Sequence, residues 1–290
     1  MLRFTQLFLL FSLSSSVLSY EVDFKSPEGW AMSYTSSSSL NLAQIAPNKV
    51  EVGDLSVSAE LGSIPSLSNE QQKVGFNGLK DEDLNKSPIF GRIRFSLGLP
   101  WDITGEASIT PPLEIDGAKP KTLWGLAFSR PFIEGESIEF GTRVFLTRGQ
   151  VEADVTCSKE TALVEPYKPG NLSGCIGTSN DKLSVDHEGI EFILAYKSSL
   201  TGFKPWISFA STQLNSSVKV DAPLQSGQEL VNLSSEGTIQ TYSLGVNYSL
   251  SERQILTFAS SYTPLDVLRP VNLDDRDSFW NFKIGFALSF

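Results

Sequence analysis

Residues 280–290, WNFKIGFALSF, decide how the rest of the chain is interpreted. Successive side chains of a β-strand point to opposite faces of a sheet, and this segment alternates without a break. One face carries Trp280, Phe282, Ile284, Phe286, Leu288 and Phe290, and the other carries Asn281, Lys283, Gly285, Ala287 and Ser289. The segment therefore predicts a strand with one wholly apolar face and one small or polar face.

The same period of two recurs along most of the chain. It predicts strands at 53–63, 89–99, 102–111, 121–132, 137–156, 184–198, 203–220, 237–250, 253–266 and 278–290. Aromatic and aliphatic residues occupy one face of these segments, and charges and glycine occupy the other. A polar inside and an apolar outside are typical of a transmembrane barrel, whose closure satisfies every backbone group in lipid.

We therefore predict an all-β fold, an antiparallel up-and-down transmembrane β-barrel of about ten strands over residues 53–290, with about eight to twelve as the range. Connections alternate between short turns and long loops. Short turns are expected at 100–101, 133–136, 199–202 and 251–252, and long loops at 64–88, 112–120, 157–183, 221–236 and 267–277. Because periplasmic turns are short in this class, both ends of the mature chain are expected on the periplasmic side.

Residues 1–19 have the parts of a secretory signal peptide, with Arg3 before a short apolar run and small residues near Ser19. Residues 20–52 alternate poorly and predict a short helix around Trp30 to Tyr34, followed by a flexible tract. This non-barrel segment is interpreted as a plug of the lumen or a helix at the periplasmic rim, with a further strand as an alternative. A second helix is expected at 69–85, within the first long loop.

Composition limits the function. The 290 residues carry a net charge of −10, which disfavours nucleic acid as a partner because phosphate backbones need a basic surface. One histidine and two cysteines are too few for a His/Cys zinc site, and phosphate-loop, dinucleotide and G-x-S-x-G motifs are missing. We expect no metal, no cofactor and no established catalytic residue.

Cys157 and Cys175 are predicted to form a disulfide, because export leads to an oxidising compartment and the two residues are not a C-x-x-C pair. The bond would close a loop rich in glycine, proline, serine and asparagine, on the outer side of the barrel.

Taken together, the exported N-terminus, the alternating strands and the final strand resemble Gram-negative outer-membrane β-barrel proteins. Phe282, Phe286, Leu288 and Phe290 are similar to the C-terminal signal that the barrel assembly machinery reads in that class. The resemblance implies the bacterial outer membrane as location, and the assembly machinery, outer-membrane lipid and lipopolysaccharide as partners. It does not single out a functional family.

A set of charged residues is expected to point into the lumen. They are Asp54, Glu60, Arg92, Arg94, Glu106, Glu139, Arg143, Glu191, Lys197 and Lys283. Buried charges need partners, so an interior salt-bridge network is the simpler interpretation of this set. A selectivity lining for a small solute is the functional alternative.

Three hypotheses about function remain open from the sequence. The first is a non-enzymatic pore or uptake protein for a small or amphipathic solute, and the second is a lipid-modifying enzyme with His187 as general base. Asp186 and Glu188 adjoin His187 but point to the opposite face of its strand. The third is a structural or surface-interaction barrel, whose outer loops include the acidic stretch Asp274, Asp275 and Asp277.

Overall fold

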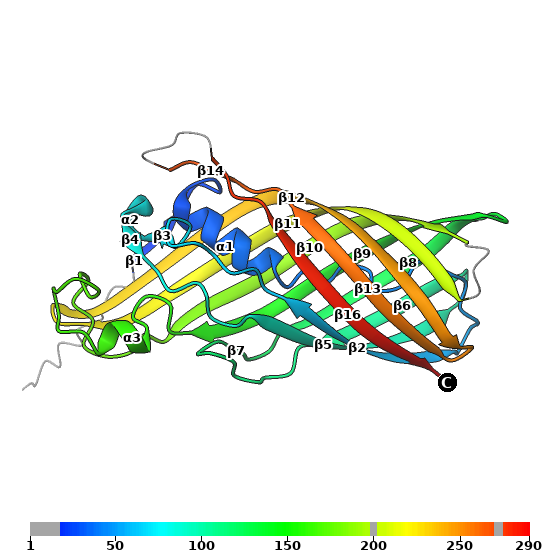
Figure 1. The fold of residues 1–290 in the computed structure, drawn as a ribbon, viewed down its shortest axis with the longest axis horizontal. Helices are drawn as coiled ribbons and strands as arrows, with labels where there is room; N and C mark the ends of the chain where they lie inside the picture. The colour runs from blue at the N-terminus through cyan, green and yellow to red at the C-terminus, as the bar shows by residue number, and fades with distance from the viewer. Residues whose placement is uncertain (1–17, 198–201, 270–274) are drawn as a thin grey trace, which may run out of the picture.

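A computed structural model describes residues 18–197, 202–269 and 275–290. Within these residues ten antiparallel strands close into a barrel, which confirms the predicted fold (Figure 1). Around the barrel the strands follow the order β12 (Gly227–Ser251), β11 (Phe203–Leu224), β10 (Asp181–Tyr196), β9 (Ile138–Ala153), β8 (Trp124–Glu134), β6 (Ile103–Ile109), β5 (Ile89–Leu99), β2 (Leu55–Ser63), β16 (Phe279–Ser289) and β13 (Gln254–Thr263). β13 then pairs with β12 and closes the sheet.

The two faces of the wall differ as the alternation predicts. The outer face is a belt of exposed large apolar side chains, among them Phe95, Phe128, Leu244, Phe282 and Ile284. The inner face buries charged and hydroxyl side chains instead, including Glu60, Arg94 and Thr241. An apolar outside with a polar inside is stable in lipid, whereas it would be unfavourable in water.

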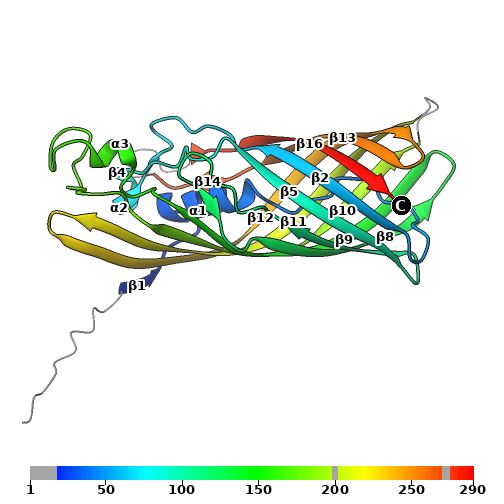
Figure 2. The ribbon, with the colours of Figure 1, turned by 90° about the horizontal axis from the view of Figure 1, so that it is seen from below.

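The N-terminal segment starts at the long-loop end of the barrel. β1 (Leu18–Glu21) pairs in parallel with residues 231–234 of β12, beyond the closed part of the wall. Helix α1 (Pro27–Ser37) follows, with Ser26 accepting a hydrogen bond from the Gly29 amide and proline in the first turn. Figure 2 shows α1 between the strands at that end, and the chain then running along the barrel toward the start of β2.

Apolar side chains of α1 fix its place inside the barrel. Trp30 stacks on Tyr34, and Tyr34 meets Phe279 of β16 edge to face, with ring centroids 5.3 Å apart. Leu214 and Ile239, on the inner faces of β11 and β12, complete this cluster. The helix is therefore held by burial of aromatic and aliphatic area against the wall.

Three expectations about the N-terminal and loop regions are wrong. The sequence placed both ends of the mature chain at the short-turn end, but the N-terminal end, with β1 and α1, lies at the long-loop end, and only the C-terminal end lies where it was expected. Residues 221–236 are not a loop, because β11 and β12 continue as a hairpin that turns at Gln225 and Ser226 with Gly227 at positive φ. Residues 69–85 form no long helix, because Phe76 and Asn77 adopt positive φ between two glycines.

Short elements gather at the long-loop end. They are β3 (Lys73–Val74), α2 (Gly75–Gly78), β4 (Lys80–Asp81), β7 (Lys119–Pro120), α3 (Lys159–Ala162), β14 (Asp266–Val267) and β15 (Asp275–Arg276). The predicted disulfide is confirmed, with Cys157 and Cys175 bonded at a Cα separation of 5.8 Å. Within the described residues, no helix is long and apolar enough to cross a bilayer. The predicted signal peptide lies outside these residues, apart from Leu18 and Ser19 in β1.

Candidate functional site

The segment after α1 fills the lumen. Leu40, Asn41, Leu42, Ala43, Gln44 and Ala46 are each between 1% and 6% exposed. These residues follow one another along the barrel, so a passage wide enough for water cannot run beside them at this level. We call residues 38–47 the plug segment. It leaves the lumen closed at the depth where it crosses the wall residues.

Polar groups of the wall hold the backbone of the plug segment. Glu191 accepts a 2.8 Å hydrogen bond from the Ala43 amide, and Asn247 accepts one of 2.9 Å from the Ala46 amide. Lys283 donates to the Leu40 carbonyl at 3.1 Å. An extended segment has no backbone partners of its own, so these contacts satisfy groups that burial would otherwise leave unpaired.

A connected ion network surrounds the same segment. Arg94 pairs with Glu60 at 2.7 Å and with Glu106 at 2.9 Å, and Arg143 pairs with Glu106 at 2.7 Å. Arg92 and Lys283 lie 3.5 and 3.9 Å from Glu60, and Arg143 lies 3.7 Å from Glu191. We call these residues the lumen network: Glu60, Arg92, Arg94, Glu106, Arg143, Glu191 and Lys283.

The network is joined to the plug segment as well as to itself. The Arg92 guanidinium donates to the Leu40 carbonyl at 3.2 Å and to the Ser39 carbonyl, and Arg143 donates to the Asn41 carbonyl. Seven of the ten predicted lumen residues are thus brought together, and they bind the protein's own chain. Their donors and acceptors are committed to the plug and to each other in this state.

The other three predicted lumen residues lie at the short-turn end. Glu139 pairs with Lys197 at 3.3 Å and also with Lys204, which the sequence did not single out. Lys197 is partly exposed at this rim. The prediction is wrong for Asp54, which precedes β2 and is exposed outside the lumen.

Glycines on the inner wall make room for the plug segment and for the residues that follow it toward β2. A Cβ atom on Gly285 would lie 2.7 Å from Cδ of Gln44, and one on Gly98 would lie 2.0 Å from the Glu51 carbonyl oxygen. The second contact involves backbone, which cannot move aside as a flexible side chain can. The small face that the sequence assigned to these strands is therefore the face that the N-terminal segment packs against.

The aromatic residues of the predicted assembly signal point outward. Phe282, Phe286 and Phe290 are exposed on the lipid-facing side, and β16 pairs with β13 and β2 on its two edges. The Phe290 amide donates to the Leu55 carbonyl at 2.9 Å, which holds the chain end on β2.

His187 faces the lumen and is fully buried, and neither ring nitrogen has a hydrogen-bond partner among the described residues. Its sequence neighbours are elsewhere. Asp186 pairs with Arg148 at 3.0 Å on the outer face, and Ser184 is within 3.4 Å of Gln150. Neither Asp186 nor Ser184, which lie close to His187 in the sequence, is therefore a partner of its ring.

An apolar cavity lies beside α1, toward the long-loop end. Its volume is about 370 Å³, within the range of pockets that hold small organic ligands. Its walls come from α1, from the outer parts of β9, β10 and β11, and from residues 110–123. They include Met32, Tyr34, Val151, Val185, Val218 and Val220.

Sequence reasoning missed this cavity, although a signal for it exists. Along β9 the outward positions change from Val144 and Leu146 to the polar Arg148 and Gln150, while the inward Val151 is apolar. Beyond the lipid belt the alternation is thus inverted, with apolar residues inside and polar residues outside. The outer part of the barrel is built like a water-soluble barrel around an apolar interior.

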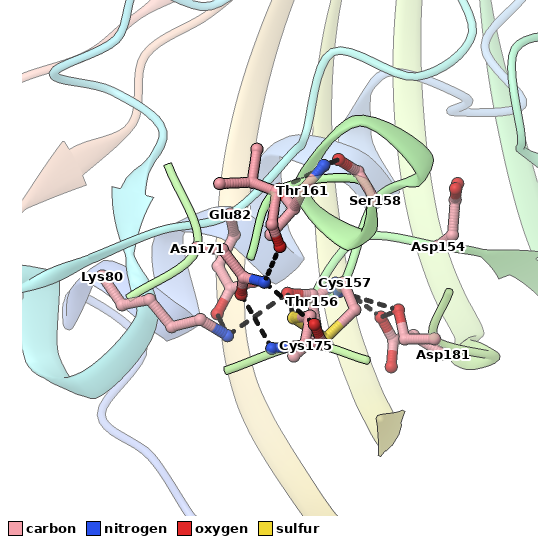
Figure 3. Close-up of a disulfide and its surroundings, with 12 residues drawn as sticks. Lys80, Glu82, Asp154, Thr156, Cys157, Ser158, Thr161, Asn171, Cys175 and Asp181 are labelled. Carbon is pink, nitrogen blue, oxygen red and sulfur yellow. Dashed lines mark hydrogen bonds and ion pairs between the residues drawn. A yellow bond between two sulfur atoms is a disulfide. The ribbon is translucent and has the colours of Figure 1, made fainter. Parts of the chain in front are cut away.

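Some of the polar residues that line the cavity, among them Glu82, Thr156 and Asp181, lie near the disulfide (Figure 3). Glu82 lines the cavity and pairs with Lys80 at 2.9 Å, and its other carboxyl oxygen, Oε2, is buried with no hydrogen-bond partner among the described residues. Lys80 also donates to the Thr156 carbonyl at 3.4 Å, next to Cys157. The disulfide loop is anchored in turn by Asn171, which binds the backbone of Cys175.

Burial raises the pKa of Glu82 to about 8, against the opposing effect of Lys80. The folded protein therefore holds a proton at Glu82 that the unfolded chain loses near its ordinary pKa of 4.5. Its contribution to stability is complete below pH 4.5 and is lost as pH rises through about 8. We expect the long-loop end to loosen above pH 8, and Glu82→Gln to flatten this dependence. Amide hydrogen exchange of residues 64–88 at pH 6 and pH 9 measures this loosening. The same pH dependence of exchange in the unaltered protein and in Glu82→Gln would contradict the role of Glu82.

Comparison with known proteins gives likenesses of fold. No family model matches the sequence, and no curated protein matches it. Among solved structures the chain is similar to the outer membrane protease OmpT of Escherichia coli, at 14% identity over 82% of this chain and 94% of OmpT, with a TM-score of 0.40. It is also similar to the toluene transporter TodX of Pseudomonas putida, at 10% identity over 94% of this chain and 77% of TodX, with a TM-score of 0.35.

The closed wall, the apolar outer belt and the charged interior define the class of protein on their own. The chain is a closed ten-stranded β-barrel with the apolar outer face of a transmembrane barrel, and its own N-terminal segment fills the lumen. Proteins of this class have diverse activities, so the particular role has to be argued from the site.

Proposed function

We propose that this protein takes up a small apolar or amphipathic solute into the cavity beside α1, after export by the signal peptide at residues 1–19. One observation carries the proposal, namely an apolar cavity of about 370 Å³ at the long-loop end of the barrel. Apolar lining favours a solute that leaves water on binding, because the driving force scales with the apolar area removed from water. The final-strand aromatics support delivery by the barrel assembly machinery, and the outer face supports contact with lipid and lipopolysaccharide.

The ion network does not favour an open, charge-selective pore. Its charged groups bind one another and the backbone of the plug segment, so a passing ion would have to displace both. The apolar cavity instead offers a place where a solute can bind without disturbing those contacts. The proposal is therefore uptake by binding, rather than passive flow along the lumen.

Filling the cavity is expected to prevent binding. Val218→Trp adds a large ring on the cavity side of β11, and Asn215→Trp adds the same ring on the exposed outer side of that strand. We expect Val218→Trp to weaken binding of the fluorescent apolar probe phenylnaphthylamine by at least about tenfold, since the ring occupies the volume that the probe needs. Asn215→Trp should change it by less than about twofold, because that side chain does not line the cavity.

The measurement is a fluorescence titration of the refolded protein in nanodiscs whose brominated lipid chains quench probe dissolved in the lipid, with retained heat-modifiable gel migration as the check on folding. Absence of probe binding to the unaltered protein would contradict the proposed function. Equal weakening by both variants would show that the probe binds elsewhere.

A further inference from the structure

One stretch of the barrel wall lacks a neighbour on one side. β5 pairs with β2 over Ile89–Leu97, but it pairs with β6 only from Ile93 onward. Residues 89–92 therefore have a ladder partner on one edge alone, within the described part of the chain. An unpaired strand edge in a membrane barrel is costly unless it borders a cavity or water, so this edge calls for a specific explanation.

The residues that follow β6 explain why β5 lacks a partner here. Thr110 still bonds to Leu123 on the β8 side at 2.9 Å, but Pro111 and Pro112 follow. Proline has no amide proton to donate and cannot extend a ladder toward β5. The chain leaves the wall here and rejoins the sheet where β7 pairs with β9.

The apolar cavity reaches the wall at this place from both sides. Its lining includes Leu61, Ile89 and Gly91, which belong to the outer face of β2 and β5, together with Phe90 and Leu123, which are buried. Leu61 and Ile89 are 55% and 45% exposed, and Leu113 at the turn is 66% exposed. Because residues of both faces line it, the cavity extends past the unpaired edge of β5, where the exposed side chains Leu61, Ile89 and Leu113 are apolar.

Of the three routes out of the cavity, the sideways route past residues 89–92 is the most favourable for an apolar molecule. Toward the short-turn end the plug segment and the lumen network block the barrel, and crossing them would break buried ion pairs. Toward the long-loop end the cavity is bordered by Glu28, Glu82, Lys86 and Asp181. Sideways, the rim of exposed aliphatic side chains is suited to lipid rather than to water.

We propose that the gap between residues 89–92 of β5 and the turn at 110–113 is a lateral passage, through which an apolar molecule moves between the cavity and the outer leaflet of the membrane. The inference rests on the proposed function and specifies its substrate class, namely molecules that dissolve in lipid and carry at most a small polar group. Charged solutes would be excluded, because the exposed rim side chains Leu61, Ile89 and Leu113 are apolar and cannot replace the water that a charged group loses.

Obstructing the passage tests the proposal. Gly91→Phe places a ring at the rim, where an added Cβ would meet Leu61 Cδ2 at an ordinary 3.5 Å, so the backbone need not move. The matched control is Ala107→Phe, on the exposed outer face of β6 and away from the cavity lining. Both proteins are placed in nanodiscs whose lipid chains are brominated, so that phenylnaphthylamine fluoresces only when it has left the lipid for the cavity.

After rapid mixing with the probe, we expect the fluorescence of Gly91→Phe to rise at least about tenfold more slowly than that of the unaltered protein, with a similar final amplitude. Ala107→Phe should match the unaltered protein in both rate and amplitude. Unchanged rates in Gly91→Phe with full amplitude would overturn the lateral passage and leave the proposed function intact. No amplitude in the unaltered protein would instead remove the proposed function itself.

A second measurement does not depend on the folding of Gly91→Phe. The sequence contains two cysteines, and both are in the disulfide, so Gly91→Cys with Leu113→Cys adds the only free thiols. Joining them with a bifunctional maleimide after refolding should slow the fluorescence rise as the phenylalanine does. The same protein capped with single maleimides is the control, and an equal rate in the joined and capped proteins would contradict the passage.

Discussion

A mature chain that begins at Pro47 is expected to form an ion-conducting barrel, whereas the full mature chain is expected to carry no current. The truncation removes α1 and nearly all of the plug segment, in which all residues from Leu40 to Ala46 except Ile45 are buried in the lumen. The remaining wall is lined by Glu60, Arg92, Arg94 and other charged groups, which would then face water. Single-channel recording in a planar bilayer measures the effect as stepwise current.

The control for this prediction is a chain that lacks only residues 20–25, and so keeps both α1 and the plug segment. It should remain closed, because its lumen contacts are intact. Stepwise current from the full mature chain, at the same frequency as from the truncated one, would contradict a lumen closed by residues 38–47. Reversal of charge at Arg94 should alter current only in the truncated protein.

The second large effect is expected from Glu60→Ala. Glu60 is buried among three cations, Arg92, Arg94 and Lys283, and its removal leaves them without the carboxylate that they share. Loss of one partner from a buried ionic group costs about 3–5 kcal/mol, because the remaining charges stay buried. We expect the free energy of unfolding in detergent to fall by that amount, as measured by urea titration.

The matched control for Glu60→Ala is Arg148→Ala. Arg148 pairs with Asp186 at 3.0 Å on the outer surface, where the two side chains are 56% and 45% exposed. An exposed pair contributes less than about 1 kcal/mol, so this variant should unfold close to the unaltered protein. Similar losses in the two variants would mean that the lumen network is hydrated rather than buried.

The strands of the barrel could be predicted from the sequence because lipid and lumen impose opposite demands on alternate residues. The strand predicted at 89–99 is observed over the same residues, and the strands predicted at 203–220 and 237–250 lie within the longer β11 and β12. The disulfide could also be predicted, because the sequence has only two cysteines and its N-terminus predicts export. Where alternation faded, at 221–236, the strands continued outside the membrane, where no lipid face is required.

The pairing within the lumen could not be predicted in the same way. That Arg143 reaches Glu106 and Glu191 depends on the register of β6, β9 and β10, which no local pattern fixes. The role of Asn247 illustrates the same limit, because its partners at Gln44 and Ala46 are about two hundred residues away. Predicting the cavity would have required the observation that the alternation inverts beyond the lipid belt. Predicting the gap in the wall would have required the observation that Pro111 and Pro112 end the ladder between β5 and β6.

The central claim is that the N-terminal segment crosses the lumen, and a designed disulfide tests it most directly. Gln44→Cys and Gly285→Cys place thiols on the plug segment and on the inner face of β16, where an added Cβ lies 3.2 Å from Cγ of Gln44. The pair Gln44→Cys with Ala107→Cys, on the outer face of β6, is the control. Mass spectrometry of the oxidised protein should find the Gln44→Cys/Gly285→Cys bond in nearly every molecule and no bond in the control. Absence of that bond in correctly folded barrels would contradict the plugged lumen.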